Sequence, residues 1–238
     1  QKITTSCIEL GIDLAPSLQV PGAATSTYLF LTDEKGDMEL AVSDMEIYQH
    51  LTPRFLSTKE ALLNNARLVV ADTNIPAESL AWLAENCKAP LFVDPVSTAK
   101  AGKVQPILGR LHTLKPNRIE AELLSGISIT GEESLERCAR ALLDTGLHRV
   151  FISLGADGVY AADHLGGREH VPCFPARMVN TTGCGDAFMA ALAWSWLEGL
   201  GLDESARAGL AASAIAMEGE ETINPELDVS ALRERAGL

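Results

Sequence analysis

Short apolar runs alternate with helical stretches over most of the chain. The runs predicted as strands are 66–72, 90–94, 111–114, 149–154 and 159–161. The stretches predicted as helices are one opening at Pro76, then 118–124, 132–143, 184–197 and 204–217. Runs this short, bounded by turn residues, are typical of buried strands. Their alternation with helices predicts an α/β fold, in which a mostly parallel sheet is sandwiched by helices.

The first part of the chain has a different pattern. Apolar and polar residues alternate over 25–31 and 38–42, and the polar run 33–37 separates the two segments. This pattern predicts a β-hairpin within residues 20–45. The segment from Gly166 to Arg168 is predicted as a turn, and the whole chain, 1–238, is read as one domain.

Composition narrows the class of protein. The 238 residues are 47% hydrophobic, enough for a full core, and the formal net charge of −13 argues against a nucleic-acid partner. The five cysteines are widely spaced and form no C-x-x-C pair, so neither a disulfide framework nor a zinc site is indicated. No apolar run is long enough to span a membrane, and we expect a cytoplasmic protein without membrane partners.

Polar residues gather where the predicted strands end. They are Asp72, Asn74, Asp94, Lys115, Asn117, Ser153 and Gly155. Each can be an ordinary turn or cap residue. The carboxyl ends of parallel strands share one edge of a sheet, however, and ligands bind there in open α/β folds. We therefore expect these residues on one rim.

The segment from Asn180 to Asp186 reads Asn-Thr-Thr-Gly-Cys-Gly-Asp and precedes an apolar helix. Gly183 and Gly185 let the backbone approach a ligand closely, and the N–H groups at the helix entrance favour an anion. Asp186 would repel a resting phosphate but can accept a proton from a hydroxyl that attacks one. The alternative is a glycine turn before a buried helix, with Asp186 complementing the helix dipole.

Two further segments fit phosphate chemistry, and each has a structural alternative. Asn117 and Glu120 have the spacing of a helix capping box, but they can also face phosphates and organise Mg²⁺ through water. Ser153, Gly155 and Gly158 lie in a strand-turn-strand segment that is either a plain β-turn or a nucleotide-phosphate loop.

Taken together and in this order, the three segments resemble the motifs of the ribokinase family of PfkB-type carbohydrate and nucleoside kinases. The resemblance covers essentially the whole chain and implies ATP and Mg²⁺ as cofactors, with Asp186 as the general base. It also implies that the N–H groups of Gly183, Cys184 and Gly185 stabilise the transferring phosphoryl group, and that Glu120 and Asn117 serve the metal. Asn117, Ser153, Gly155 and Gly158 then bind the nucleotide, and Asn224 is the residue we choose for the adenine.

Within the family, the segments 71–76, 92–97 and 112–118 most resemble the members that phosphorylate the nucleoside pseudouridine. The resemblance implies that the acceptor is the ribose 5′-hydroxyl and the product is pseudouridine 5′-phosphate. Asn74 falls where the family contacts the sugar, and the hairpin falls where it carries a lid, so Thr25, Thr27 and Asp44 are predicted to bind the nucleoside. The alternative for the hairpin is a simple edge or a homodimer contact.

Three departures from the family pattern qualify these expectations. Asn180 replaces an aspartate in a region that helps relatives hold a potassium-like ion, so monovalent activation is doubtful. Cys184 replaces a small residue where only backbone is required. The strand and glycine-rich segments with which the family begins are not found before Gln1, so the N-terminal part is expected to be absent. The alternatives are a family kinase for another sugar or nucleoside and a non-catalytic nucleoside-binding relative.

Overall fold

The computed structural model describes residues 2–32 and 38–238, and its main feature is a six-stranded sheet. The strands are β3 (Val69–Asp72), β4 (Leu91–Asp94), β5 (Thr113–Leu114), β6 (Arg149–Ser153), β7 (Val159–Asp163) and β8 (Arg168–Val171). They lie side by side in chain order, β3 to β6 parallel and β7 and β8 antiparallel. The expected α/β fold with a mostly parallel sheet is confirmed.

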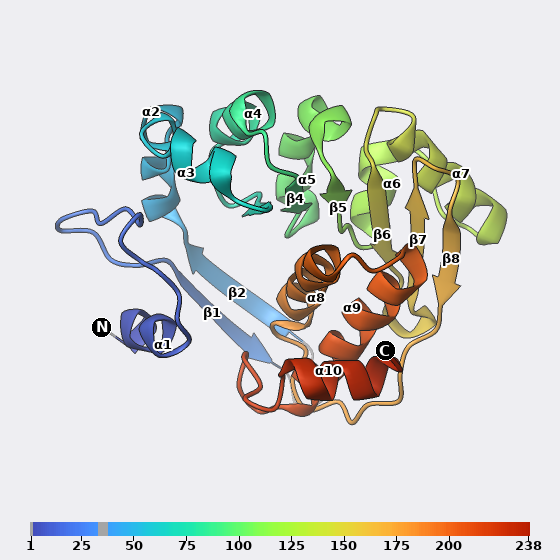
Figure 1. Cartoon of the computed structure of the whole chain (residues 1–238). Coiled ribbons are helices and arrows are strands. Elements are labelled where there is room, and N and C mark those ends of the chain that lie inside the picture. Colours follow the sequence, from blue (N-terminus) through green and yellow to red (C-terminus); the bar gives the residue numbers. More distant parts are fainter. Residues whose placement is uncertain (1, 33–37) are drawn as a thin grey trace.

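Helices cover both faces of this sheet (Figure 1). One face carries α4 (Ala77–Asn86), α5 (Thr98–Ala101), the 3₁₀ helix η2 (Gly102–Arg110), α6 (Arg118–Ser125) and α7 (Glu132–Leu143). The other face carries α8 (Cys184–Glu198) and α9 (Leu202–Glu218), and α10 (Val229–Ala236) packs against α9. The molecule therefore has three layers.

The two-residue period of the strands explains the two apolar faces. In β6, Val150 and Ile152 enter the core beneath α6 and α7, whereas Phe151 points to the opposite core and meets Phe188 of α8 edge-on. Phe92 of β4 joins Phe151 on that side. Small residues bring α8 and α9 together: a Cβ on Gly209 would lie 2.4 Å from the Phe188 ring.

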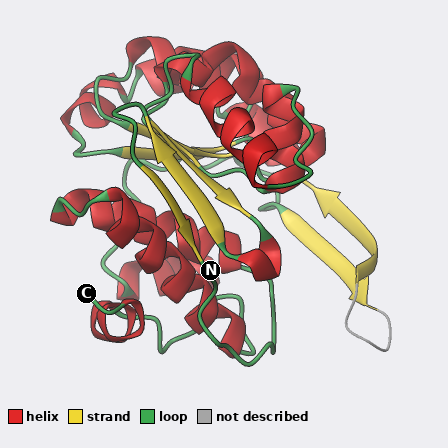
Figure 2. Ribbon diagram, turned by 90° about the vertical axis from the view of Figure 1, so that its right-hand side faces the viewer, coloured by secondary structure: helices red, strands yellow, loops and turns green. Residues whose placement is uncertain are grey.

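The part of the chain before the sheet is more open. It comprises α1 (Lys2–Glu9), β1 (Thr27–Thr32), β2 (Met38–Asp44), the 3₁₀ helix η1 (Glu46–His50), α2 (Pro53–Ser57) and α3 (Glu60–Asn65). Strands β1 and β2 form the expected antiparallel hairpin, which pairs Thr27 with Asp44 and extends away from the three layers (Figure 2). The polar run 33–37, predicted as its turn, lies outside the described residues.

The predicted elements differ from the structure mainly at β8. Residues 166–168 were predicted as a turn, but Arg168 already begins β8, which pairs with β7. Three of the four β8 residues are exposed, so this outer strand lacks the apolar signal by which the others were recognised. In the described parts of the chain, no helix has the length and apolar character needed to cross a membrane.

Candidate active site

The polar residues at the strand ends share one rim, as predicted. Asp72 ends β3 directly beside Asp94 at the end of β4. Lys115 follows β5, and its ammonium lies 3.0 Å from a carboxylate oxygen of Asp94. Asn117 forms a β-bridge with Ser153 at the end of β6. The parallel register brings these side chains together although up to 81 residues separate them along the chain.

Helix α8 begins opposite this rim, and its entrance is fixed by backbone contacts. Gly183 has a φ of 89°, and a Cβ there would lie 2.4 Å from the carbonyl oxygen of Thr222, so only glycine fits without a shift. The Asn180 side chain accepts a hydrogen bond from the Thr182 N–H and donates one to the Glu220 carbonyl. In the first turn, the N–H groups of Gly185 and Asp186 have no acceptor within the helix. They remain available to an anion.

Asp186 stands in that first turn and opens onto the rim. Although Asp186 is exposed, partial desolvation of its carboxyl disfavours the charged form and raises its pKa above the usual range. The Asp94 and Asp72 carboxylates raise the pKa further, against the effect of the Lys115 ammonium. A carboxylate with a raised pKa is a stronger proton acceptor, which suits a general base.

A hollow of about 570 Å³ lies next to Asp186. Asp72 and Asp94 share its lining with apolar side chains, among them Ile75 and Met189. Its volume falls within the range of small-molecule sites. A larger hollow of about 680 Å³, between Arg118, Leu135 and Asp157, lies away from Asp186. The first hollow is the better substrate site because it contains the candidate base.

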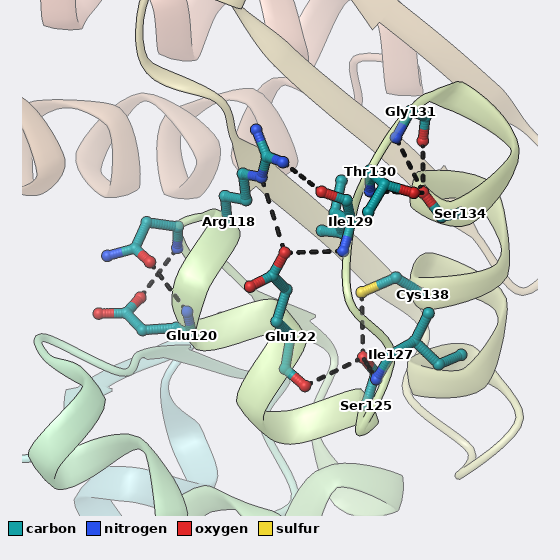
Figure 3. Close-up of polar contacts among 11 residues, drawn as sticks. Arg118, Glu120, Glu122, Ser125, Ile127, Ile129, Thr130, Gly131, Ser134 and Cys138 are labelled. Carbon is teal, nitrogen blue, oxygen red and sulfur yellow. Dashed lines mark hydrogen bonds and ion pairs between the residues drawn. The ribbon is translucent and has the colours of Figure 1, made fainter.

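Asn117 and Glu120 form the capping box that their spacing predicts. The Glu120 N–H donates to Asn117 Oδ1 at 2.9 Å, and the Asn117 N–H donates to Glu120 Oε2 at 2.8 Å (Figure 3). Glu120 is buried, and desolvation raises the pKa of its carboxyl; the Asn117 N–H lowers this pKa, Asp94 raises it and Lys115 lowers it. The cap holds both residues at the rim while the Asn117 amide stays exposed.

A second set of polar contacts, between α6 and the backbone of Ile129, holds the start of α6. Glu122 accepts a hydrogen bond from the Ile129 N–H at 2.7 Å and lies 3.7 Å from Arg118 Nε, and Arg118 also donates to the Ile129 carbonyl (Figure 3). These contacts tie α6 to the segment before α7. They support the orientation of the helix that carries Glu120.

The loop after β6 contains Ser153, Gly155 and Gly158. Gly155 is exposed with a φ of 64°, and a Cβ there would meet nothing within 4 Å. Gly158 has a φ of 89°, and a Cβ there would lie 2.0 Å from the Val171 carbonyl oxygen. Gly158 is therefore needed for the pairing of β7 with β8, whereas Gly155 leaves its backbone open toward solvent.

Asn74 is held in a chain of polar contacts. Its side-chain amide donates to Asp72 at 2.7 Å, and its oxygen accepts from the Lys100 ammonium at 2.6 Å. Lys103 supports the same turn by donating to the carbonyls of Thr73 and Ile75. The two lysines were not singled out from the sequence, because they lie in a segment that was not predicted as helix.

The remaining predicted residues do not line the hollow beside Asp186. Thr25, Thr27 and Asp44 are exposed at the base of the hairpin and do not line the hollow. Asn224 is buried, donating to the Ile215 carbonyl at 2.6 Å and accepting from the Glu226 N–H at 3.0 Å. Burial raises the pKa of the Cys184 thiol, which disfavours the reactive thiolate.

Asp94 and Lys115 form a pair for which no specific role was predicted from the sequence, beyond their place on the rim. Asp94 also accepts a hydrogen bond from the Val96 N–H at 2.8 Å, within a turn where Val96 has a φ of 64°. A positive φ is rare for a β-branched residue and marks local strain. The sequence signal for the pair is a charged residue after each of two apolar runs.

Comparisons with known proteins agree with this geometry. The model for the pfkB family of carbohydrate kinases matches residues 1–229. Pseudouridine kinase from Escherichia coli (strain K12) is 40% identical over 231 residues, which cover 97% of this chain and 74% of that protein. An uncharacterized sugar kinase of the same strain, YeiI, is 36% identical over 221 residues, 91% of this chain and 60% of that protein.

Solved structures show the same fold. A putative sugar kinase from Clostridium perfringens superimposes with a TM-score of 0.87 at 30% identity, over 99% of this chain and 75% of that one. Ribokinase from Thermotoga maritima gives a TM-score of 0.86 at 22% identity, over 100% of this chain and 77% of that one. The matched part of each of these proteins thus carries the same arrangement of sheet and helices.

Proposed function

This chain belongs to the pfkB family of carbohydrate kinases and is an ATP-dependent kinase, and we propose that it phosphorylates the 5′-hydroxyl of pseudouridine. The products are pseudouridine 5′-phosphate and ADP. The observation that carries this proposal is the placement of Asp186 in the first turn of α8, beside free N–H groups and at the edge of the hollow. The identity to pseudouridine kinase over nearly the whole chain supports the choice of acceptor.

In the proposed reaction, the nucleoside hydroxyl attacks the γ-phosphorus of ATP and gives its proton to Asp186. A base at this position must face both the hydroxyl and the phosphoryl group, and the first turn of α8 supports both roles. The N–H groups at the entrance of α8 stabilise charge on the transferring group. Those of Gly185 and Asp186 have no acceptor within the helix, whereas the Cys184 N–H already donates to the Thr181 carbonyl at 3.4 Å. The raised pKa of Asp186 favours proton transfer to it.

The nucleotide side of the site is assigned to the rim across from α8. Asn117, Ser153 and Gly155 contact the phosphates, and Asn224 lies in the loop that meets the adenine. Gly158 shapes the same loop, because its N–H and its carbonyl are hydrogen-bonded within the turn. Asn117 and Glu120 would hold Mg²⁺ near the phosphates largely through water, as hard oxygen ligands do, and the ion would offset charge on the phosphates. The described residues contain no cluster of three His, Cys, Asp or Glu side chains that could hold a metal ion.

The nucleoside is assigned to the hollow and to the hairpin. Asn74 contacts the ribose, and Thr25, Thr27 and Asp44 reach the nucleoside when the hairpin closes as a lid and excludes water. The hairpin also exposes the apolar cross-strand pair of Leu29 and Val42. This pair supports a homodimer formed through the lid. The five free thiols fit the cytoplasm as the compartment.

A panel of acceptors tests the proposal. Pseudouridine, uridine, adenosine and ribose are offered with Mg²⁺ and ATP, and ADP release is measured by a coupled assay. We expect kcat/KM for pseudouridine to exceed that for each other acceptor by at least about 10-fold, which corresponds to a difference of about 1.4 kcal/mol in transition-state binding. Equal rates with all four acceptors would overturn the assignment.

Phosphorylation of a different sugar is the second candidate, and the 36% identity to the sugar kinase YeiI favours it. Such an enzyme would use the same rim and the same Asp186 but would prefer ribose or another sugar in the panel. A non-catalytic nucleoside-binding protein would bind nucleoside without releasing ADP from ATP. The same assay, combined with calorimetric titration of nucleoside, separates these outcomes.

A further inference from the structure

Lys115 is a buried lysine in the middle of the rim. It follows β5 directly, only 7% of the residue is exposed, and its ammonium lies 3.0 Å from Asp94 Oδ2. Lysines are almost never buried unless they are paired, and burying a charge costs free energy that such a pair offsets only in part. A structural pair could have been replaced by apolar residues. A buried pair is therefore weak evidence for a stabilising role, and its place at this edge of the sheet points to another one.

The Lys115 ammonium has N–H donors that the pair with Asp94 does not use. It carries three N–H groups, whereas among the described residues Asp94 is its only ion-pair partner. The position that a Cβ on Gly185 would take lies 3.5 Å from Lys115 Nζ. The ammonium therefore stands over the entrance of α8, next to the free N–H groups of Gly185 and Asp186. A positive charge and helix N–H groups that converge on one point suit a phosphoryl group.

Asp94 holds the lysine in place. One of its carboxylate oxygens faces Lys115, and the other accepts the N–H of Val96 in the strained turn after β4. With both oxygens engaged, the carboxylate has little freedom to rotate. The direction of the ammonium is thus set by backbone geometry, as electrostatic preorganisation requires.

The rim carries several carboxylates, and the Lys115 ammonium offsets their negative charge. Asp72, Asp94 and Asp186 all line the hollow, and together they would repel the phosphates of ATP. The two other lysines near this edge are directed to different acceptors. Lys100 donates to the Asn74 side chain, and Lys103 donates to backbone carbonyls. Lys115, in contrast, faces the entrance of α8.

We propose that Lys115 is a further catalytic residue of this kinase, whose ammonium contacts an oxygen of the transferring phosphoryl group, and that Asp94 is its positioning residue. The inference rests on the proposed kinase function. The hydroxyl oxygen forms a bond to the γ-phosphorus, the bond to the bridging oxygen of ADP breaks, and ADP leaves with that electron pair. The hydroxyl proton goes to Asp186. Lys115 stays protonated and stabilises the charge that spreads over the phosphoryl oxygens.

The test compares Lys115→Met, Asp94→Asn and the double variant with the wild-type protein. Lys115→Met alone leaves Asp94 unpaired, whereas the double variant removes both charges and restores a neutral pair of similar volume. We expect kcat to fall about 100- to 1,000-fold in Lys115→Met and in the double variant, as for loss of an oxyanion-hole donor. Asp94→Asn should stay within about 10-fold of wild type. KM for the acceptor should change little.

Exposed Lys88→Met serves as the matched control and should retain wild-type kcat. Thermal unfolding of every variant shows whether it is folded at the assay temperature. If Lys115 only neutralises Asp94, the double variant should recover to the rate of Asp94→Asn, and that recovery would overturn the proposal. A loss in Asp94→Asn as large as that in Lys115→Met would overturn it too, by making Asp94 the essential group.

Nucleotide binding provides a readout that does not depend on turnover. Calorimetric titrations compare Mg·ADP with Mg·ADP plus beryllium fluoride, which mimics the γ-phosphoryl group. We expect beryllium fluoride to increase the affinity of the wild-type protein at least about 10-fold and to have little effect in the double variant. An equal gain in both proteins would contradict a contact between Lys115 and this group. If the wild-type protein binds neither complex, it is the kinase function itself that fails.

Discussion

The two ends of the sheet differ in the surroundings of their ionisable side chains. At the carboxyl end, Asp94, Lys115 and Asp186 are kept together as a cluster of charges. At the amino end, His112 stacks against Phe92 with ring centroids 5.1 Å apart and lies 4.2 Å from the Trp196 ring centroid. Only the two residues of β5 separate His112 from Lys115. One very short strand thus connects an aromatic cluster to the catalytic rim.

The cause of this difference is what surrounds each group. Burial lowers the pKa of His112 to about 4, and nearby Arg149, His148 and His164 lower it in the same direction. Burial and these neighbouring side chains therefore all oppose a positive charge on His112. At the other end, Lys115 counters the repulsion among the carboxylates and Asp186 opens onto the hollow. The side chains at the amino end pack as a buried aromatic cluster. At the carboxyl end, charged side chains lie close together at an unfavourable electrostatic energy, as is common at functional sites.

The largest expected effect is at the carboxyl end. Asp186→Asn should lower kcat by about 100- to 10,000-fold, because an amide cannot accept the hydroxyl proton. Binding of ATP and nucleoside, measured by calorimetry, should persist because the shape of the side chain is kept. Glu198→Gln, at the far end of the same helix, is the matched control and should keep its rate. An unchanged kcat in Asp186→Asn would remove Asp186 from the base role.

A smaller effect is expected at the amino end, on stability in acid. Because the pKa of His112 falls from its usual 6.5 to about 4 on folding, its contribution is present above pH 6.5 and is lost as the pH falls toward 4. The loss amounts to about 3 kcal/mol at most. His112→Phe should flatten the decline of unfolding free energy between pH 6.5 and 4, measured with urea. A decline as steep in His112→Phe as in wild type would contradict the assignment.

The smallest expected effect is on thermal stability at the carboxyl end, and its pH dependence has the opposite sign to that of His112. The pKa of Asp186 is raised on folding, so its contribution to stability is present at low pH and is lost as the pH rises through the folded pKa. Asp186→Asn should therefore melt above wild type at pH 7, and the difference should shrink toward pH 4. Calorimetric scans at both pH values measure it. A variant that melts below wild type at pH 7 would show that the carboxylate stabilises the fold.

Much of the fold could be predicted because the strands are short apolar runs bounded by turns. Strand β6 was predicted as 149–154 and spans Arg149–Ser153. Strand β8 was missed since Arg168, Glu169 and His170 carry no apolar signal and its pairing depends on β7. Tertiary pairing, and not local propensity, makes this segment a strand.

The site could be predicted in outline but not in its charge pairs. The Asn117 and Glu120 cap follows from local spacing, and it forms as expected. The contact between Asp94 and Lys115 joins residues 21 positions apart, and it depends on which strands are neighbours and in what register. The aromatic cluster around His112 depends on Trp196, which comes from a helix on one face of the sheet. Such contacts cannot be predicted from residues that are adjacent in the sequence.

The strands of the sheet lie side by side in chain order, so they are synthesised from one edge of the sheet to the other. Asp186, in α8, is synthesised after all six strands. The layer formed by α8, α9 and α10 comes entirely from residues 184–238. Until these emerge, Phe92 and Phe151 on that face of the sheet lack their covering helices, and the nascent chain needs protection from aggregation. A nascent chain that ends before α8 also lacks Asp186, the candidate base.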